Sequence, residues 1–152
     1  MSTPPNVPGY TVEGLLGSGG DAQVWLAVDQ SGRQRVAVKQ IRNLTSADRY
    51  RLHREAALQA GIVHPHVLRV LGIHDGDDLV LVLELAEGGS LLDLITARGA
   101  LAPGEVVTAC APIAQALDAV HRRGLVHGDV SCGNVLFTAE GRPVLSDLGV
   151  AR

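Results

Sequence analysis

The sequence has few cysteines, no excess of positive charge and no long apolar run, and each absence excludes a class of protein. Two cysteines, Cys110 and Cys132, match neither a disulfide framework nor a zinc-ligand spacing, so a reducing, cytoplasmic location is expected. A formal net charge of −3 provides no electrostatic footprint for nucleic acid. No run of about 18 apolar residues is present, so we predict no membrane-spanning segment within this stretch.

Lysine is almost absent. Of the 13 basic residues, 12 are arginine, and Lys39 is the one lysine. Arginine and lysine replace one another on most solvated surfaces, so a lone lysine points to a position where arginine will not serve. A compact ammonium group that must reach a phosphate is such a position.

What is present is typical of a globular domain. The 152 residues are 46% hydrophobic and 19% charged, enough for one domain with its own core. Residues 1–9 lack the charged and apolar regions of a signal peptide, and we predict a short flexible arm. The folded part is therefore expected to begin near Tyr10.

A glycine-rich stretch, residues 17–24, follows a predicted strand at residues 10–16. Two further strands are predicted at residues 24–29 and 35–41, and the second contains Lys39. Glycines let backbone N–H groups approach phosphate oxygens without side chains in the way. An ordinary glycine turn is the alternative, but glycine loop, hairpin and embedded lysine in this order favour a phosphate site.

A helix is predicted to follow. Thr45 and Asp48 have the spacing of a capping box, and Gly61 is a stop signal after about residue 60. Glu55 lies within this helix, where a glutamate is normally a solvated surface residue. After the helix, His64 is read as a capping or core histidine, because Pro65 follows it and no further metal ligand is nearby.

The second half of the chain is predicted to contain two more strands and then helices. Apolar runs at residues 67–73 and 79–85 indicate the strands, and residues 86–89 form the best candidate boundary between two lobes. Helices are predicted at residues 90–98 and from Pro103 to about residue 122. The expected buried stripe of the long helix, in which the cysteine is a core residue, is Val106, Cys110, Ile113, Leu117 and Val120.

Polar residues interrupt the short apolar runs near the end of the sequence. Asp129 is followed five positions later by Asn134, and Asp147 comes thirteen positions after that. Carboxylate and carboxamide oxygens suit Mg²⁺ held beside phosphates. Two turns that each close a hairpin are the simpler interpretation.

Taken together, these residues resemble the protein kinase family, specifically bacterial (actinobacterial-like) serine/threonine kinases of the eukaryotic type. The spacings from Val24 to Lys39, from Lys39 to Glu55 and from Glu55 to His64 agree with that family. The resemblance implies an α+β, two-lobed fold with a five-stranded antiparallel N-lobe sheet and one helix. Residues 10–85 would be the N-lobe, 86–89 the hinge and 90–152 the start of a helical C-lobe, which stops after Asp147-Leu148-Gly149.

The resemblance also implies roles for individual residues. Asp129 would accept the proton of the substrate hydroxyl, and Lys39 would pair with the nucleotide phosphates and with Glu55. Asn134 and Asp147 would hold Mg²⁺. The residues expected to bind ATP are Leu16, Gly17, Ser18, Gly19, Gly20, Val24, Ala37, Lys39, Leu83, Glu84, Ala86 and Leu136.

Several positions depart from the family pattern. An acid, Asp21, takes the place of the aromatic residue at the loop tip, and Ser131 stands where a lysine normally faces the γ-phosphate, which would weaken transition-state stabilisation. Gln59 falls where an apolar residue is expected. The remaining departures are Ala22 for the third glycine, Gly128 for arginine and Leu148 for phenylalanine.

The function expected from the resemblance is ATP-dependent phosphoryl transfer to serine or threonine of proteins, with ATP and Mg²⁺ as cofactors. The protein substrate is not indicated. The 152 residues are expected to be part of a longer kinase and to be inactive by themselves. Two alternatives stay open, namely a nucleotide-binding pseudokinase or interaction module and a small-molecule phosphotransferase of the aminoglycoside-kinase type.

Overall fold

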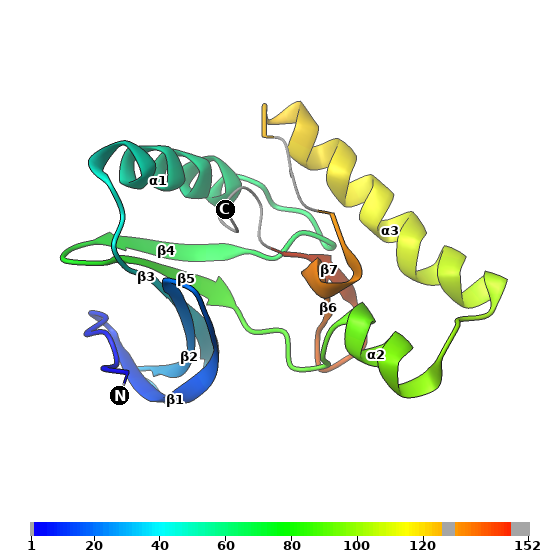
Figure 1. The fold of residues 1–152 in the computed structure, drawn as a ribbon, viewed down its shortest axis with the longest axis horizontal. Helices are drawn as coiled ribbons and strands as arrows, with labels where there is room; N and C mark the ends of the chain where they lie inside the picture. Colours follow the sequence, from blue (N-terminus) through cyan, green and yellow to red (C-terminus); the bar gives the residue numbers. More distant parts are fainter. Residues whose placement is uncertain (1, 126–129, 147–152) are drawn as a thin grey trace. The chain divides into compact units, whose positions relative to one another are not determined.

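The computed structural model describes residues 2–125 and 130–146. The chain divides into two compact units, one made of residues 1–57 and 70–85 and the other of residues 58–69 and 86–152. Figure 1 labels the helices and strands of the chain. Within the described residues, no helix is long and apolar enough to cross a membrane.

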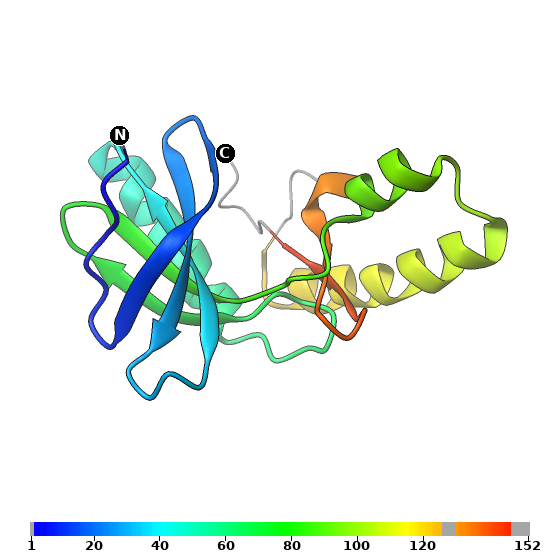
Figure 2. The same ribbon diagram turned by 90° about the horizontal axis from the view of Figure 1, so that it is seen from below.

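The first unit is built on a five-stranded antiparallel sheet with strand order β1-β2-β3-β5-β4, which confirms the predicted sheet. With the helix that follows β3, this sheet confirms the α+β class expected from the sequence. The sheet and its strands are seen from a second direction in Figure 2. The strands are β1 (Tyr10–Gly19), β2 (Ala22–Asp29), β3 (Arg35–Ile41), β4 (Val70–Asp75) and β5 (Leu79–Glu84).

The fourth strand begins later than the predicted residues 67–73. It starts at Val70, because the residues before it pair elsewhere. Val67 forms a parallel bridge with Leu145, and the Leu68 backbone N–H donates to the Leu145 carbonyl at 3.0 Å. The apolar run at residues 67–73 therefore contains both the start of β4 and a separate segment that pairs with Leu145. Hydrophobic periodicity alone does not show where one ends and the other begins.

One face of the sheet is covered by an apolar cluster that includes part of the N-terminal segment. Residues two apart on neighbouring strands supply it, as the alternation of a strand requires. Val7 belongs to the cluster and is 2% exposed, and its carbonyl accepts a hydrogen bond from Tyr10. The sequence predicted a flexible arm here, whereas Gln23 of β2 donates a hydrogen bond to the Ser2 hydroxyl and Val7 is buried in this cluster. The buried members are Val7, Trp25, Ala27, Val36, Val38, Val80 and Val82.

The helix α1 (Ser46–Ala60) begins as its sequence predicted. The Thr45 hydroxyl accepts a hydrogen bond from the Asp48 backbone N–H at 3.1 Å. Leu52 and Ala56, one turn apart, are its buried apolar residues. After the helix, His64 Nδ1 accepts a hydrogen bond from the His66 backbone N–H at 3.1 Å, a contact within the turn itself rather than a helix cap.

The second unit contains two helices and a small hairpin. Its elements are α2 (Leu91–Arg98), α3 (Pro103–Arg122), the short 3-10 helix η1 (Cys132–Asn134), β6 (Val135–Phe137) and β7 (Pro143–Leu145). The strands β6 and β7 pair antiparallel, and α3 packs against β7. The Gly88 backbone N–H donates to the Phe137 carbonyl at 2.7 Å, which fixes the connector before α2 to the end of β6.

The buried face of α3 differs from the predicted stripe. Cys110 is exposed and Val106 is 42% exposed, so the prediction of a core cysteine is wrong. The face is rotated because small alanines, rather than the larger residues beside them, point into the core. The buried residues of α3 are Ala109, Ile113, Ala116 and Val120, again spaced by four, three and four.

Candidate nucleotide and metal site

The glycine-rich stretch is a hydrogen-bonded hairpin almost to its tip. Gly17 pairs with Val24 and Gly19 with Ala22, so β1 extends through glycines that were predicted to be a loop. Gly20 and Asp21 form the turn, and Gly20 has a φ of 55°, a conformation that favours glycine. A Cβ placed on Gly17, Gly19 or Gly20 would meet no atom of residues 2–125 or 130–146 within 4 Å. The backbone of this hairpin is therefore open to an approaching group.

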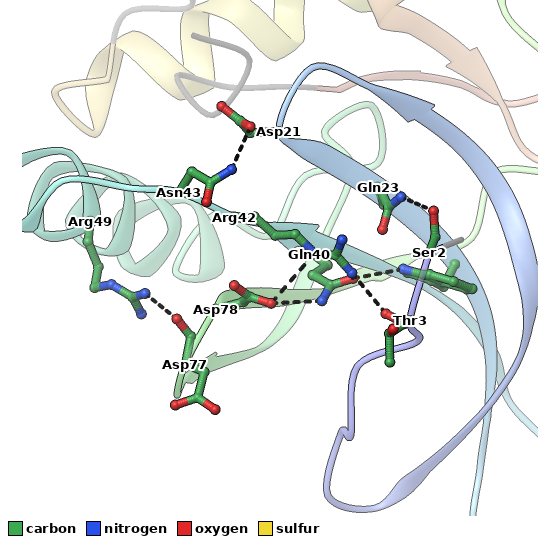
Figure 3. Close-up of polar contacts among 11 residues, drawn as sticks. Ser2, Thr3, Asp21, Gln23, Gln40, Arg42, Asn43, Arg49, Asp77 and Asp78 are labelled. Carbon is green, nitrogen blue, oxygen red and sulfur yellow. Dashed lines mark hydrogen bonds and ion pairs between the residues drawn. The ribbon is translucent and has the colours of Figure 1, made fainter.

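The acid at the tip of this hairpin has partners within its own unit. The Asn43 side-chain amide donates to Asp21 Oδ1 at 3.0 Å, and the Arg42 backbone N–H donates to the Asp21 carbonyl at 2.9 Å (Figure 3). Sequence reasoning identified Asp21 as a departure but did not identify Asn43. A polar residue after a strand can form many different hydrogen bonds, so its partner cannot be read from the sequence. The pairing of β2 with β3 places Asn43 beside the hairpin tip.

Lys39 and three of the apolar residues expected to bind ATP share one face of the sheet. Val24 lies directly opposite Lys39 across β2 and β3, and Ala37 lies opposite Leu83 across β3 and β5. Directly paired residues have their side chains on the same face, as do residues two apart on a strand. Lys39 is 8% exposed, so its ammonium group occupies a largely desolvated position. The structure thus brings four of the predicted residues together.

Glu55 is placed on α1 but pairs within its own helix. Its carboxylate lies 3.5 Å from the Arg51 guanidinium, and among the described residues this is its ion pair, rather than the expected one with Lys39. The oxygen in this ion pair, Oε2, is buried and accepts no hydrogen bond from any residue that the structure describes. A partly exposed pair of this spacing contributes about 0.3–0.5 kcal/mol, so it is a weak competitor for another cation. The Lys39 pair stays a prediction.

In the second unit, Asn134 is held to the residue that precedes Asp147. The Ser146 backbone N–H and hydroxyl both donate to the Asn134 carbonyl, at 2.8 and 3.0 Å. The pairing of Val135 with Leu145 continues this contact into the hairpin. Asn134 and Ser146 are buried. Ser146 was not identified from the sequence, although a polar residue at the end of a buried apolar strand needs a partner.

Other predicted positions in this unit are only partly described. Leu136 is half-buried in β6 and forms a bridge with Ser90. Ser131 is exposed at the start of η1, and its carbonyl accepts from the Asn134 backbone N–H at 3.0 Å. Asp129, Asp147, Gly128 and Leu148 lie outside the described residues.

This chain belongs to the protein kinase domain family, because the model of that family matches residues 10–152. The resemblance predicted from the motifs is thereby confirmed. Among curated proteins, the chain is similar to several bacterial kinases. Serine/threonine-protein kinase PkaB of Streptomyces coelicolor is 35% identical over 94% of this chain and 37% of its own length. Serine/threonine-protein kinase PknB of Mycobacterium leprae is 30% identical over the whole chain and 26% of its own length.

Serine/threonine-protein kinase PknA of Mycobacterium tuberculosis is 34% identical over 94% of this chain and 35% of its own length. The chain therefore spans little more than a third, at most, of the length of these relatives.

Proposed function

We propose that the protein containing this chain transfers the γ-phosphoryl group of ATP to serine or threonine hydroxyls of proteins. The observation that carries the proposal is the register of the sheet. It places Lys39 directly opposite Val24, which lies on β2 just after the turn of the glycine hairpin. Lys39 is 8% exposed, and the glycines of the hairpin are accessible. A desolvated ammonium on the sheet that carries an accessible glycine hairpin is an arrangement that suits the phosphates of a nucleotide.

The residues of each unit would divide the work. In the first unit, the backbone of Gly17, Ser18, Gly19 and Gly20 would donate to phosphate oxygens and Lys39 would neutralise the α- and β-phosphates. Leu16, Val24, Ala37 and Leu83 would supply apolar contacts to the base, and the backbone of Glu84 would hydrogen-bond to it. The second unit would contribute the backbone of Ala86 and the side chain of Leu136. These two sets are the predicted ATP-binding residues, kept here as a proposal.

The donor atoms of the second unit fit a magnesium ion. Asn134 and Asp147 offer a carboxamide and a carboxylate oxygen, which are hard ligands. Ser146, the residue just before Asp147 in the sequence, donates two hydrogen bonds to the Asn134 carbonyl. When bound, the ion would neutralise charge on the β- and γ-phosphate oxygens. Asp129 would accept the proton of the attacking hydroxyl, and Glu55 would orient Lys39.

A second candidate function is nucleotide binding without phosphoryl transfer. The specific observation in its favour is Ser131, which is exposed and uncharged where a lysine toward the γ-phosphate is expected. Loss of one such charge costs about 2.7–4 kcal/mol of transition-state stabilisation when nothing replaces it. Binding of Mg·ATP by the full-length protein with no measurable transfer would favour this second function.

The experiment that distinguishes the two measures ³²P transfer from labelled ATP by the full-length protein. Lys39→Met and Asp147→Asn should each abolish transfer, because they remove the phosphate cation and a metal ligand. Arg33→Met is the matched control, since Arg33 is exposed in the turn between β2 and β3, and it should transfer at the wild-type rate. Undiminished transfer by either Lys39→Met or Asp147→Asn would rule out the proposed assignment.

A further inference from the structure

We propose that Asp21 and Asn43 form a latch that fixes the tip of the glycine-rich hairpin to the segment after β3. Both would then be positioning residues for the phosphate-binding loop, a role that rests on the function proposed above. The latch consists of the hydrogen bond from the Asn43 amide to Asp21 Oδ1 at 3.0 Å. Figure 3 shows the two side chains directed toward one another.

The backbone supports the same contact. The paired register of β2 and β3 ends at Ala22 and Ile41, and the Arg42 backbone N–H then donates to the Asp21 carbonyl at 2.9 Å. This backbone hydrogen bond extends the pairing of β2 with β3 by one residue pair, into the turn. The hairpin tip is attached through Asp21 by a backbone bond and a side-chain bond to consecutive residues.

The backbone of Asn43 has an unusual conformation. Among the described residues, Asn43 is the one non-glycine residue with a positive φ, at 56°. Asparagine tolerates this left-handed region better than most residues do, because its short polar side chain can bond locally. Here the amide bonds to Asp21, twenty-two positions earlier in the chain. An uncommon backbone conformation combined with a long-range hydrogen bond supports a functional role for Asn43.

Within the part of the chain that the structure describes, little else holds the tip of the hairpin. Residues 15–21 are all exposed, and no described atom lies within 4 Å of a Cβ placed on Gly17, Gly19 or Gly20. Segments with few apolar contacts open locally at low free-energy cost. One or two hydrogen bonds therefore determine the fraction of time that the hairpin tip is open. The latch also gives the Asp21 carboxylate a donor, so that this negative charge is held in one place beside a loop that would bind phosphates.

The first test measures backbone amide exchange of residues 17–22 in the 152-residue chain without nucleotide. Asp21→Ala and Asn43→Gly should each accelerate exchange by about two- to tenfold, the range that one hydrogen bond supports. Glycine is chosen at position 43 because it keeps the positive φ while removing the amide. Asp21→Asn retains an oxygen acceptor and should exchange as the wild type does.

The double variant separates a latch from two independent effects. If the two side chains act through one contact, Asp21→Ala combined with Asn43→Gly should exchange no faster than Asn43→Gly alone. Exchange in Asn43→Gly equal to that of the wild type would overturn the proposal. So would accelerations that multiply in the double variant.

The second test measures binding of Mg·ATP and of adenosine to the full-length protein. Asn43→Gly should weaken Mg·ATP binding by about three- to tenfold, because a freed carboxylate and a mobile loop both act on the phosphates, and should change adenosine binding by less than about twofold. Adding Asp21→Asn to that variant should recover part of the loss. An equal loss for both ligands would overturn the positioning role. Failure of the wild type to bind either ligand would refute the proposed function, while amide exchange would still decide the latch.

Discussion

The Gln59 side-chain amide donates a hydrogen bond to the backbone carbonyl of Leu68 at 2.9 Å, and both residues are buried. The sequence showed only that a polar residue stands where the family normally has an apolar one. In the structure this glutamine satisfies a carbonyl in the segment that precedes β4. The departure thus exchanges an apolar contact for a buried polar one, and it leaves no unpaired group at the Leu68 carbonyl.

Replacing Gln59 should destabilise the protein although the replacement restores the expected residue type. Gln59→Leu leaves the buried Leu68 carbonyl without its partner, at a cost of about 1–3 kcal/mol in the free energy of unfolding. Urea unfolding followed by circular dichroism measures it. Gln115→Leu on the exposed side of α3 is the matched control and should change the free energy by less than about 0.5 kcal/mol. A Gln59→Leu variant as stable as the wild type would show that the carbonyl finds another partner.

The N-terminal segment should contribute measurably to the stability of the sheet. Val7 is 2% exposed in the cluster that contains Trp25, so Val7→Ala should lower the free energy of unfolding by about 1–3 kcal/mol. Trp25 is the one tryptophan of the chain, and its fluorescence reports unfolding of this unit directly. Val63→Ala removes the same atoms from a side chain that is 75% exposed and should have almost no effect. Equal behaviour of the two variants would mean that the arm detaches in solution.

Gly88 should not tolerate a side chain. A Cβ at this position would lie 2.6 Å from the Thr138 carbonyl oxygen and 2.9 Å from that of Phe137, and both are backbone atoms that cannot move independently. Gly88→Ala should therefore destabilise the second unit by about 1–3 kcal/mol. Gly104→Ala, in the first turn of α3 with open space around it, should instead be neutral or stabilising. Thermal unfolding of both variants tests the contrast, and a shift of the same sign in each would contradict it.

Acid should weaken the start of α2. The Ser90 backbone N–H, and then its hydroxyl, hold the pKa of the Asp93 carboxyl below its ordinary value of 3.8. A pKa that is depressed in the folded state stabilises the fold above the unfolded value, and the stabilisation is lost as pH falls through the depressed one. Asp93→Asn should therefore be less stable than the wild type at neutral pH, and the difference should shrink as the pH falls below about 3.8.

Denaturant unfolding at several pH values measures this difference. Asp118→Asn on α3 serves as the comparison, because Asp118 forms an exposed ion pair with Arg122 at 3.0 Å rather than a helix cap. Exposed pairs of this kind contribute about 0.5 kcal/mol or less. A stability difference between the wild type and Asp93→Asn that does not change with pH would show that the carboxylate charge is not what stabilises the cap.

Sequence patterns predicted most of the elements correctly because each depends on local chemistry. The apolar runs of β2, β3 and β5 and the cap formed by Thr45 need only residues close to one another in the chain. The errors occurred where an apolar run had two possible partners. Val67 was assigned to a strand but pairs with Leu145, and Cys110 was assigned to the core although Ala109 beside it occupies that face.

By itself, the sequence determined the family and the residues that its motifs mark, because those follow from residue type and spacing, and the resemblance to that family then implied the five-stranded sheet. Only the tertiary structure decided which side chains hold those residues in place. Asn43 bonds to Asp21, Ser146 to Asn134 and Arg51 to Glu55. The first two of these contacts join residues more than ten positions apart, and no local pattern encodes such a distance. The physical reason is that a polar side chain can satisfy its hydrogen bonds in many ways, and strand register and chain folding select one of them.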